Sequence, residues 1–484
     1  MKKRTLTENV VYNMLYQVLV TVLPIITTPY ITRTLGLRAN GIHSFTESIV
    51  TYFIILGSIG TSLYGIRKIA YVSDDGEQLS KVTAEIMLLK LALMLITLAV
   101  YIPLLCINNE FAYIYRIQII NIVANGIDIS WFYQGIEDFK KVTLRNLLVK
   151  MIFIACLFLF IKKPSDLSLY VFFTVVGALI GNLIMIYYLP KYIDIHSVKK
   201  VDLLCHIKPS LLLFVPQAMN YIYALLDRSM LGWMTNTDNV SIYDQAQRLV
   251  RMITAILQSV GYAMMARVAN LTAGNDREGI KEYIKKSADF NFFLAFPATF
   301  GILGIADDFI PFFLGKEYVE VIPTLKVLSV LILTMSINNV LGVQLLMPIG
   351  KERAYTVATA SGAVVNILVN IILIPKLGIL AACISSIAAE IVVLLISYYN
   401  ARDMIDLFGI LKGNIWVVSA SVIMYFAVRL VSHANIVIIL KLILELLVGG
   451  GIYFLLMFIT HNQILKIIIE KTFDIVKKIV KNGN

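Results

Sequence analysis

Long apolar runs recur along the whole chain, separated by short polar connections. Most runs are about 20 residues long, the length that an α-helix needs to cross a bilayer. They do not alternate between apolar and polar positions, as the strands of a membrane barrel would. The pattern predicts about fourteen transmembrane helices, near residues 9–32, 41–64, 83–106, 111–132, 142–161, 167–189, 209–232, 242–266, 287–314, 323–347, 353–374, 377–399, 413–431 and 436–460.

The composition of the chain supports this pattern. Of its 484 residues, 58% are hydrophobic and 15% are charged, whereas about 25% are charged in an ordinary soluble domain. A soluble enzyme, a disulfide scaffold, a coiled coil and a disordered chain are therefore excluded. The expected fold is an all-α polytopic membrane protein.

The sequence lacks the common motifs for metal binding, disulfide chemistry and nucleotide binding. The four cysteines are far apart with no CxxC pair, there is no HExxH, and there is no GxxxxGK phosphate loop. The loops are too short for an extramembrane catalytic domain. We therefore expect no metal, no cofactor and no enzymatic activity.

The positive charge of the chain lies mainly on one side of the predicted membrane. Alternating the spans places 27 Lys and Arg residues in one set of loops with the termini, and 6 in the other set. Cytoplasmic loops carry such an excess, so both termini are expected in the cytoplasm of a multi-pass protein of the cell membrane. The net charge of +11 is thus explained by anionic membrane lipids as partners, not by nucleic acid.

A weak internal repeat divides the chain. The sequence RTLG at Arg33, followed by Ile42, is echoed by RSMLG at Arg228, followed by Ile242. Six spans per repeat is an even number, which predicts parallel repeats about an axis along the membrane normal. The expected domains are two six-helix lobes at 1–190 and 209–400, a cytoplasmic linker at 191–208, and a terminal helix pair with a basic tail at 401–484.

Polar residues inside the spans are the candidate functional residues, because a charge in the bilayer usually faces a bundle interior or a water-filled cavity. Spacings of three and four place many of them on shared helix faces. Together they predict a hydrated cavity between two lobes. The set expected to line it is Glu47, Gln217, Asn220, Asp227, Asp244, Arg248, Arg251, Gln258, Asn366 and Asn370.

A purely structural role stays open for most of these residues. Asp244 and Arg248 are four apart and can neutralise each other, and Asp227 can reach the membrane interface. Asn366 and Asn370 can join helices by hydrogen bonds. Arg251 sits deeper, with a like-charged neighbour three residues away, which favours a functional role.

Asp128 is a candidate for coupling to an ion gradient. It ends a polar stripe with Asn121 and Asn125 and has no basic partner on that stripe. It is a candidate site for a proton or Na⁺, or else it is a hydrogen-bonded helix end beside Trp131.

Five stretches of the sequence resemble a known family. They are RTLGLRANGIHSFTES (33–48), GSIGTSLYGIRK (57–68), DISWFYQGIEDFK (128–140), and LLDRSMLG (225–232) followed by YDQAQRLV (243–250). The chain is similar to polysaccharide-export flippases of the Wzx type, in the multidrug/oligosaccharidyl-lipid/polysaccharide exporter superfamily. The resemblance covers essentially the whole chain, but its motifs are degenerate.

The resemblance implies a function. The expected cargo is an undecaprenyl-pyrophosphate-linked oligosaccharide, moved from the inner to the outer leaflet by alternating access for assembly of a capsule, exopolysaccharide or teichoic acid. Polysaccharide polymerase and glycosyltransferases of the same pathway are expected partners. The cavity in such flippases is cationic, a pattern that Arg248 and Arg251 match, with Arg228 and Arg116 as weaker candidates for holding the headgroup. The first span has no basic residue before Arg33, which argues against a peptidoglycan precursor as the main cargo.

Three other classes of membrane protein stay open. A drug or cation antiporter of the same superfamily would need an acidic cavity. A membrane glycosyl polymerase or ligase usually needs a large outer loop, and none is expected here. A non-transporting scaffold has no reason to place charges within the membrane.

Overall fold

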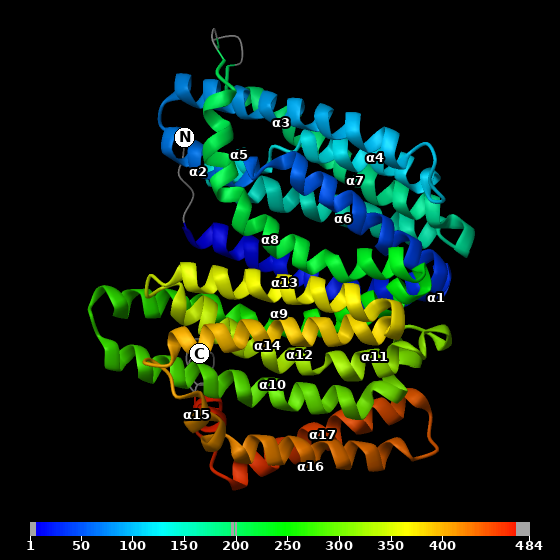
Figure 1. Cartoon of the computed structure of the whole chain (residues 1–484), viewed down its shortest axis with the longest axis vertical. Coiled ribbons are helices and arrows are strands. Elements are labelled where there is room, and N and C mark those ends of the chain that lie inside the picture. The colour runs from blue at the N-terminus through cyan, green and yellow to red at the C-terminus, as the bar shows by residue number, and fades with distance from the viewer. Residues whose placement is uncertain (1–5, 195–197, 199–200, 471–484) are drawn as a thin grey trace, which may run out of the picture. The chain divides into compact units, whose positions relative to one another are not determined.

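The computed structural model describes residues 6–194, 198 and 201–470, apart from the side chains of 6–22, 215–224, 260 and 262–263. Within these residues the chain is helical and has no β-strand (Figure 1). The all-α class predicted from the apolar runs is confirmed. The chain divides into two compact units, Met1–Ser241 and Ile242–Asn484.

The first unit contains eight α-helices and two short 3-10 turns among the described residues. Its helices are α1 (Leu6–Ser58), α2 (Thr61–Val72), α3 (Gly76–Leu105), α4 (Ala112–Gly126), α5 (Ser130–Gly135), α6 (Phe139–Phe160), α7 (Leu167–Tyr188) and α8 (Leu204–Met234), with short 3-10 turns η1 (Pro164–Asp166) and η2 (Leu189–Lys191).

The second unit contains the rest of the helices. They are α9 (Thr237–Ala273), which begins in the first unit, α10 (Arg277–Phe313), η4 (Lys316–Tyr318), α11 (Val321–Leu328), α12 (Val330–Asn338), the π-helical segment η5 (Asn339–Leu346), α13 (Glu352–Leu377), α14 (Ile379–Ala401), α15 (Leu407–Gly413), α16 (Ile415–Ser432) and α17 (Ile438–Ile459).

The predicted spans all fall on observed helices, although their boundaries differ. The first two spans fall within α1, where two helices meet at Gly36, a non-helical residue with φ 74° and ψ −178°. A positive φ of this kind favours glycine because it has no Cβ. The chain therefore breaks at Gly36, inside the stretch predicted as a loop at 33–40, although the break is shorter than predicted.

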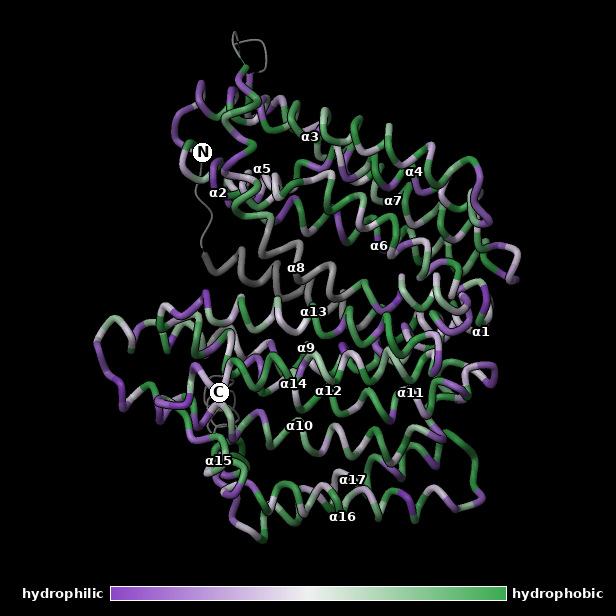
Figure 2. Tube along the Cα trace, viewed as in Figure 1, coloured by the Kyte–Doolittle hydropathy of each residue, from purple (hydrophilic) through white to green (hydrophobic). Residues whose placement is uncertain are grey.

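The helices expose apolar side chains, as expected for helices that lie in a membrane. Among the described residues, eleven helices are long and apolar enough to cross a membrane. Figure 2 shows apolar residues along the helices and hydrophilic residues gathered at the turns. Leu430, Leu446 and Leu447 are 75%, 64% and 66% exposed, and such faces suit lipid as a solvent. The count of fourteen crossings and the lobe boundaries stay predictions.

The core of the first unit is built around α5. Trp131, Phe132 and Tyr133 are at most 1% exposed, and the Tyr133 hydroxyl donates to the Met185 carbonyl oxygen of α7 at 2.7 Å. Gly65 of α2 lies so close that a Cβ there would be 2.5 Å from the Trp131 ring. This aromatic stretch, part of the motif at 128–140, is thus a packing element that joins α2, α5 and α7.

The last two long helices, α16 and α17, pack on each other and on α10. Ion pairs reinforce this packing. Asp307 of α10 accepts hydrogen bonds from Lys326 of α11, at 2.7 Å, and from Arg429 of α16. The neighbouring Asp308 pairs with Lys441 of α17 at 3.3 Å.

Candidate functional site

The first group of candidate residues lies where α8 packs on α1. Arg228 Nη1 is 4.0 Å from Glu47 Oε2, and the two side chains are 12% and 40% exposed. Next to them, the hydroxyls of Ser229 and Tyr52 are 2.9 Å apart. Asp227 is buried, at 2% exposure. The structure thus brings Glu47 and Arg228 together as an ion pair between two helices, reinforced by a hydroxyl pair.

A second group lies on α9. Arg248 Nε donates to Asp244 Oδ2 at 2.8 Å, with the arginine side chain 43% exposed and the aspartate side chain 3% exposed. Arg251 follows three positions later and is half-buried, as is Gln258. The accessible member of the Asp244–Arg248 ion pair is the cation. This face can receive an anion such as a phosphate.

The asparagines of α13 form an interhelical contact. Asn366 and Asn370 are fully buried. Asn366 donates to the Ser385 hydroxyl of α14 at 3.2 Å, and Asn370 donates to the Asn366 side-chain oxygen at 3.2 Å. The arrangement is that of helix-joining hydrogen bonds. Their place in a cavity stays a prediction.

Three more of the predicted residues are Gln217, Asn220 and Arg116. Gln217 and Asn220 belong to α8, in the part whose side chains lie outside the described residues. Arg116 donates from Nε to the carbonyl oxygen of Cys106 at 2.9 Å. Because Cys106 directly follows α3, Arg116 interacts with a helix C-terminus, which favours positive charge.

Asp128, the coupling candidate, has partners from other helices. Its Oδ1 accepts from the Ser130 hydroxyl at 2.5 Å and lies 3.9 Å from Arg145 Nη1 of α6. Arg145 also donates to the Ser130 hydroxyl at 2.9 Å and to Asn182 of α7. The basic partner missing from its own stripe comes from α6, so its carboxylate is compensated. Its coupling role stays a prediction.

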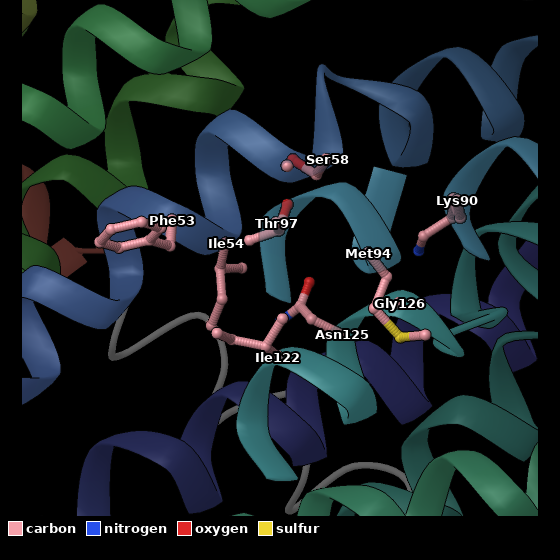
Figure 3. Close-up of a pocket in the computed structure, with 10 residues that line it drawn as sticks. Phe53, Ile54, Ser58, Lys90, Met94, Thr97, Ile122, Asn125 and Gly126 are labelled. Carbon is pink, nitrogen blue, oxygen red and sulfur yellow. The ribbon is translucent and has the colours of Figure 1, made fainter. Parts of the chain in front are cut away.

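Sequence analysis missed Lys90 of α3. The side chain is buried, at 4% exposure for the residue, and Nζ donates to the Asp128 backbone oxygen at 2.7 Å. It lines a small cavity with Asn125 and Thr97, whose space of about 20 Å³ holds about one water molecule. Figure 3 shows the labelled side chains of this cavity. The sequence did contain a signal for this residue, because Lys90 is the one lysine within the apolar run 83–106.

These features define a class of protein. Apolar helices long enough to span a bilayer carry interhelical ion pairs and a cationic face, which is typical of membrane transporters. Residues 6–266 match the family model described as polysaccharide biosynthesis protein, and residues 213–372 match the MatE model. The chain belongs to the polysaccharide biosynthesis protein family, as a Wzx-type member of the multidrug/oligosaccharidyl-lipid/polysaccharide exporter superfamily.

Individual proteins agree with this assignment. The chain is 25% identical over 376 residues to a putative O-antigen transporter of Shigella dysenteriae, covering 77% of this chain and 94% of that protein. It is 23% identical over 401 residues to a putative O-antigen transporter of Escherichia coli (strain K12), covering 81% and 95%.

A solved structure shares the fold. The lipid II flippase MurJ in its inward closed conformation superposes with a TM-score of 0.71 at 15% identity, over 94% of this chain and 100% of that chain. These relatives are transporters, not catalysts, so the expectation that the chain is not an enzyme is confirmed.

Proposed function

We propose that this protein is a flippase for a lipid-linked oligosaccharide, and more specifically that it moves an undecaprenyl-pyrophosphate-linked repeat unit from the inner to the outer leaflet. The observation that carries the proposal is on α9, where the Arg248 guanidinium pairs with Asp244 and stays accessible, and Arg251 follows three positions later. The family and the two O-antigen transporters support a glycan cargo.

Physical chemistry explains why such a cargo needs this face. A pyrophosphate with a sugar chain cannot cross about 30 Å of hydrocarbon without a polar route. Guanidinium groups hold phosphate oxygens through paired hydrogen bonds. The polyprenyl tail can stay in lipid while the headgroup passes through the protein. Capsule, exopolysaccharide and teichoic-acid pathways all use such carriers, and their polymerases and glycosyltransferases are the proposed partners.

The decisive test of this function identifies the cargo. Depleting the protein in its host should make one undecaprenyl-linked saccharide accumulate, as measured by lipid mass spectrometry. The extracted lipid should then cross the bilayer of proteoliposomes that contain the purified protein. If no lipid-linked saccharide accumulates and the proteoliposomes do not move it, the flippase function is wrong.

The alternative is a drug or cation antiporter. Its specific support is the MatE match at residues 213–372 together with the buried carboxylates of Asp227 and Asp244. Efflux of a cationic dye by the reconstituted protein, without any movement of lipid-linked saccharide, would favour this alternative.

Orientation gives a separate prediction. We propose that both termini and the turn at Asn275, between α9 and α10, face the cytoplasm, as the distribution of Lys and Arg predicts. In a variant without native cysteines, Asn275→Cys should react with an impermeant maleimide only after permeabilisation. Lys163→Cys, in the turn before α7, is the matched control and should react in intact cells. The reverse pattern would invert the proposed topology.

A further inference from the structure

A chain of three polar side chains, of which His206 and Glu85 are buried and Tyr64 is half-buried, joins α2, α3 and α8. His206 Nε2 lies 3.0 Å from Glu85 Oε2, and His206 Nδ1 lies 2.8 Å from the Tyr64 hydroxyl. The side chains of His206 and Glu85 are 3% and 4% exposed. The proposed function uses none of these groups.

The Glu85 carboxylate is held in a fixed orientation. Its other oxygen, Oε1, accepts from the backbone N–H of Asp202 at 2.9 Å and lies 4.0 Å from Lys81 Nζ, a side chain that is 50% exposed. Asp202 stands just before α8, so this carboxylate holds both the start of α8 and the segment that leads into it.

Among the described residues, four other charged or titratable side chains lie around the pair. Lys81 belongs to α3, and Lys68 belongs to α2 with Tyr64. Asp202 and Cys205 lie at the start of α8, and partial burial raises the pKa of the Cys205 thiol, with Asp202 and Glu85 raising it further. The ligand atoms of Glu85, Cys205 and His206 lie within 4.8 Å of one another, and a metal ion would deprotonate the thiol that binds it, so the test must distinguish a bound proton from a metal ion.

The hydrogen-bond pattern accommodates two protonation states. A neutral imidazole can donate from Nε2 to Glu85 while Nδ1 accepts from the Tyr64 hydroxyl. A proton taken from water at Nδ1 makes both ring nitrogens donors, and the Tyr64 hydroxyl then rotates to accept. The contact with Glu85 becomes charge-assisted and roughly twice as strong, so proton uptake strengthens the attachment of α8.

The cluster lies at the start of α8, so a change in its contacts can move the whole helix. From His206 to Arg228 the helix rises about 33 Å at 1.5 Å per residue, close to the hydrocarbon thickness of about 30 Å. The far end of this stretch is held by the contacts of Arg228 with Glu47 and of Ser229 with Tyr52. Among the described side chains, polar contacts thus hold α8 to its neighbours near both ends of this stretch, about one bilayer thickness apart.

We propose that Tyr64, His206 and Glu85 form a proton-binding latch, which positions the start of α8 and couples the transport cycle to protons. The coupling rests on the proposed flippase function, whereas the latch itself does not. All three are positioning residues, because they act through α8 and not by touching the cargo. Asp128, whose carboxylate already faces Arg145, is the competing coupling site.

The latch can be tested without cargo. Hydrogen exchange of the full-length protein in lipid nanodiscs should show the amides of residues 204–210 roughly fivefold more protected at about pH 6 than at about pH 8, after correction for intrinsic exchange rates. In His206→Gln, which keeps a hydrogen-bond donor but does not titrate, that difference should vanish. Glu85→Gln should also remove it, because the imidazolium would lose its carboxylate.

Matched controls distinguish proton binding at His206 from titration elsewhere and from metal binding. His433→Gln, at an exposed histidine beyond α16, should keep the full pH response. Cys205→Ser and added chelator should also keep it. A response that survives in His206→Gln overturns the latch, and a response abolished by chelator or by Cys205→Ser assigns the cluster to a metal ion instead.

Transport then tests the coupling. In proteoliposomes loaded with the extracted lipid-linked saccharide, an imposed pH gradient should accelerate flipping by the wild type but not by His206→Gln. If the gradient response is lost in Asp128→Asn and retained in His206→Gln, the coupling belongs to Asp128. If the wild type does not flip the saccharide while its exchange still responds to pH, the flippase function fails and the latch stands.

Discussion

Arg251→Ala is expected to weaken capture of the lipid-linked headgroup about 10- to 100-fold, because a charge-assisted contact contributes about 1.5–3 kcal/mol net. Arg251 shares its region of α9 with Arg248, and Asp244 neutralises at most one of the two charges. The loss should appear as a lower rate of saccharide flipping at limiting cargo, measured in proteoliposomes with equal amounts of protein.

Two further variants define what the arginines do. Arg251→Lys keeps the charge but loses the planar fork that pairs with phosphate, so it should be impaired less than the alanine variant. The double variant Asp244→Ala/Arg248→Ala should flip almost normally if that ion pair only stabilises α9. Normal flipping by both Arg248→Ala and Arg251→Ala would remove the α9 face from the mechanism.

Gly41→Ala is expected to destabilise the first unit by about 3 kcal/mol, at the upper end of the usual cost of overpacking. A Cβ at this position of α1 would lie 1.9 Å from the backbone oxygen of Thr237, where α9 begins. A backbone atom cannot turn away as a side chain can, so the two helices must separate. Thermal unfolding of the purified protein, followed by tryptophan fluorescence, measures the loss.

Gly450→Ala is the matched control. This glycine also lies within a helix, α17, but a Cβ there meets no atom within 4 Å. Alanine has the higher helix propensity, by about 1 kcal/mol, so the control should be unchanged or slightly more stable. If Gly41→Ala unfolds at the wild-type temperature, α1 and the start of α9 do not approach as closely as the structure shows.

Hydropathy was sufficient to locate the helices, because burial in lipid requires long apolar runs whatever their neighbours are. It did not reveal how short the break between the first two spans is, because that break depends on the backbone conformation of Gly36. Nor did it show that the tenth span is divided among α11, α12 and η5. Such divisions depend on backbone hydrogen bonds that leave the apolar pattern unchanged.

Contacts of the site residues could be predicted only where both partners lie on the same helix. The pair of Asp244 with Arg248 follows from a spacing of four residues and was anticipated. The contacts of Asp128 with Arg145, and of Glu85 with His206, join helices far apart in sequence. Spacing within one span cannot reveal such partners, so neither the cation beside Asp128 nor the His206 cluster could be predicted from the sequence.

The carboxylates at the end of α10 have a consequence for biosynthesis. Asp307 comes 122 residues before its partner Arg429, and Asp308 comes 133 residues before Lys441. At about 5–20 residues per second, the ribosome needs roughly 6–27 s to supply these cations after the aspartates have emerged. Lys326 follows Asp307 after only 19 residues and can compensate that carboxylate early. During the longer interval Asp308 must stay hydrated or protonated at the membrane. The last helix pair therefore completes the charge balance of a helix made much earlier, and a chain truncated before α16 would leave that helix as a substrate for membrane quality-control proteases.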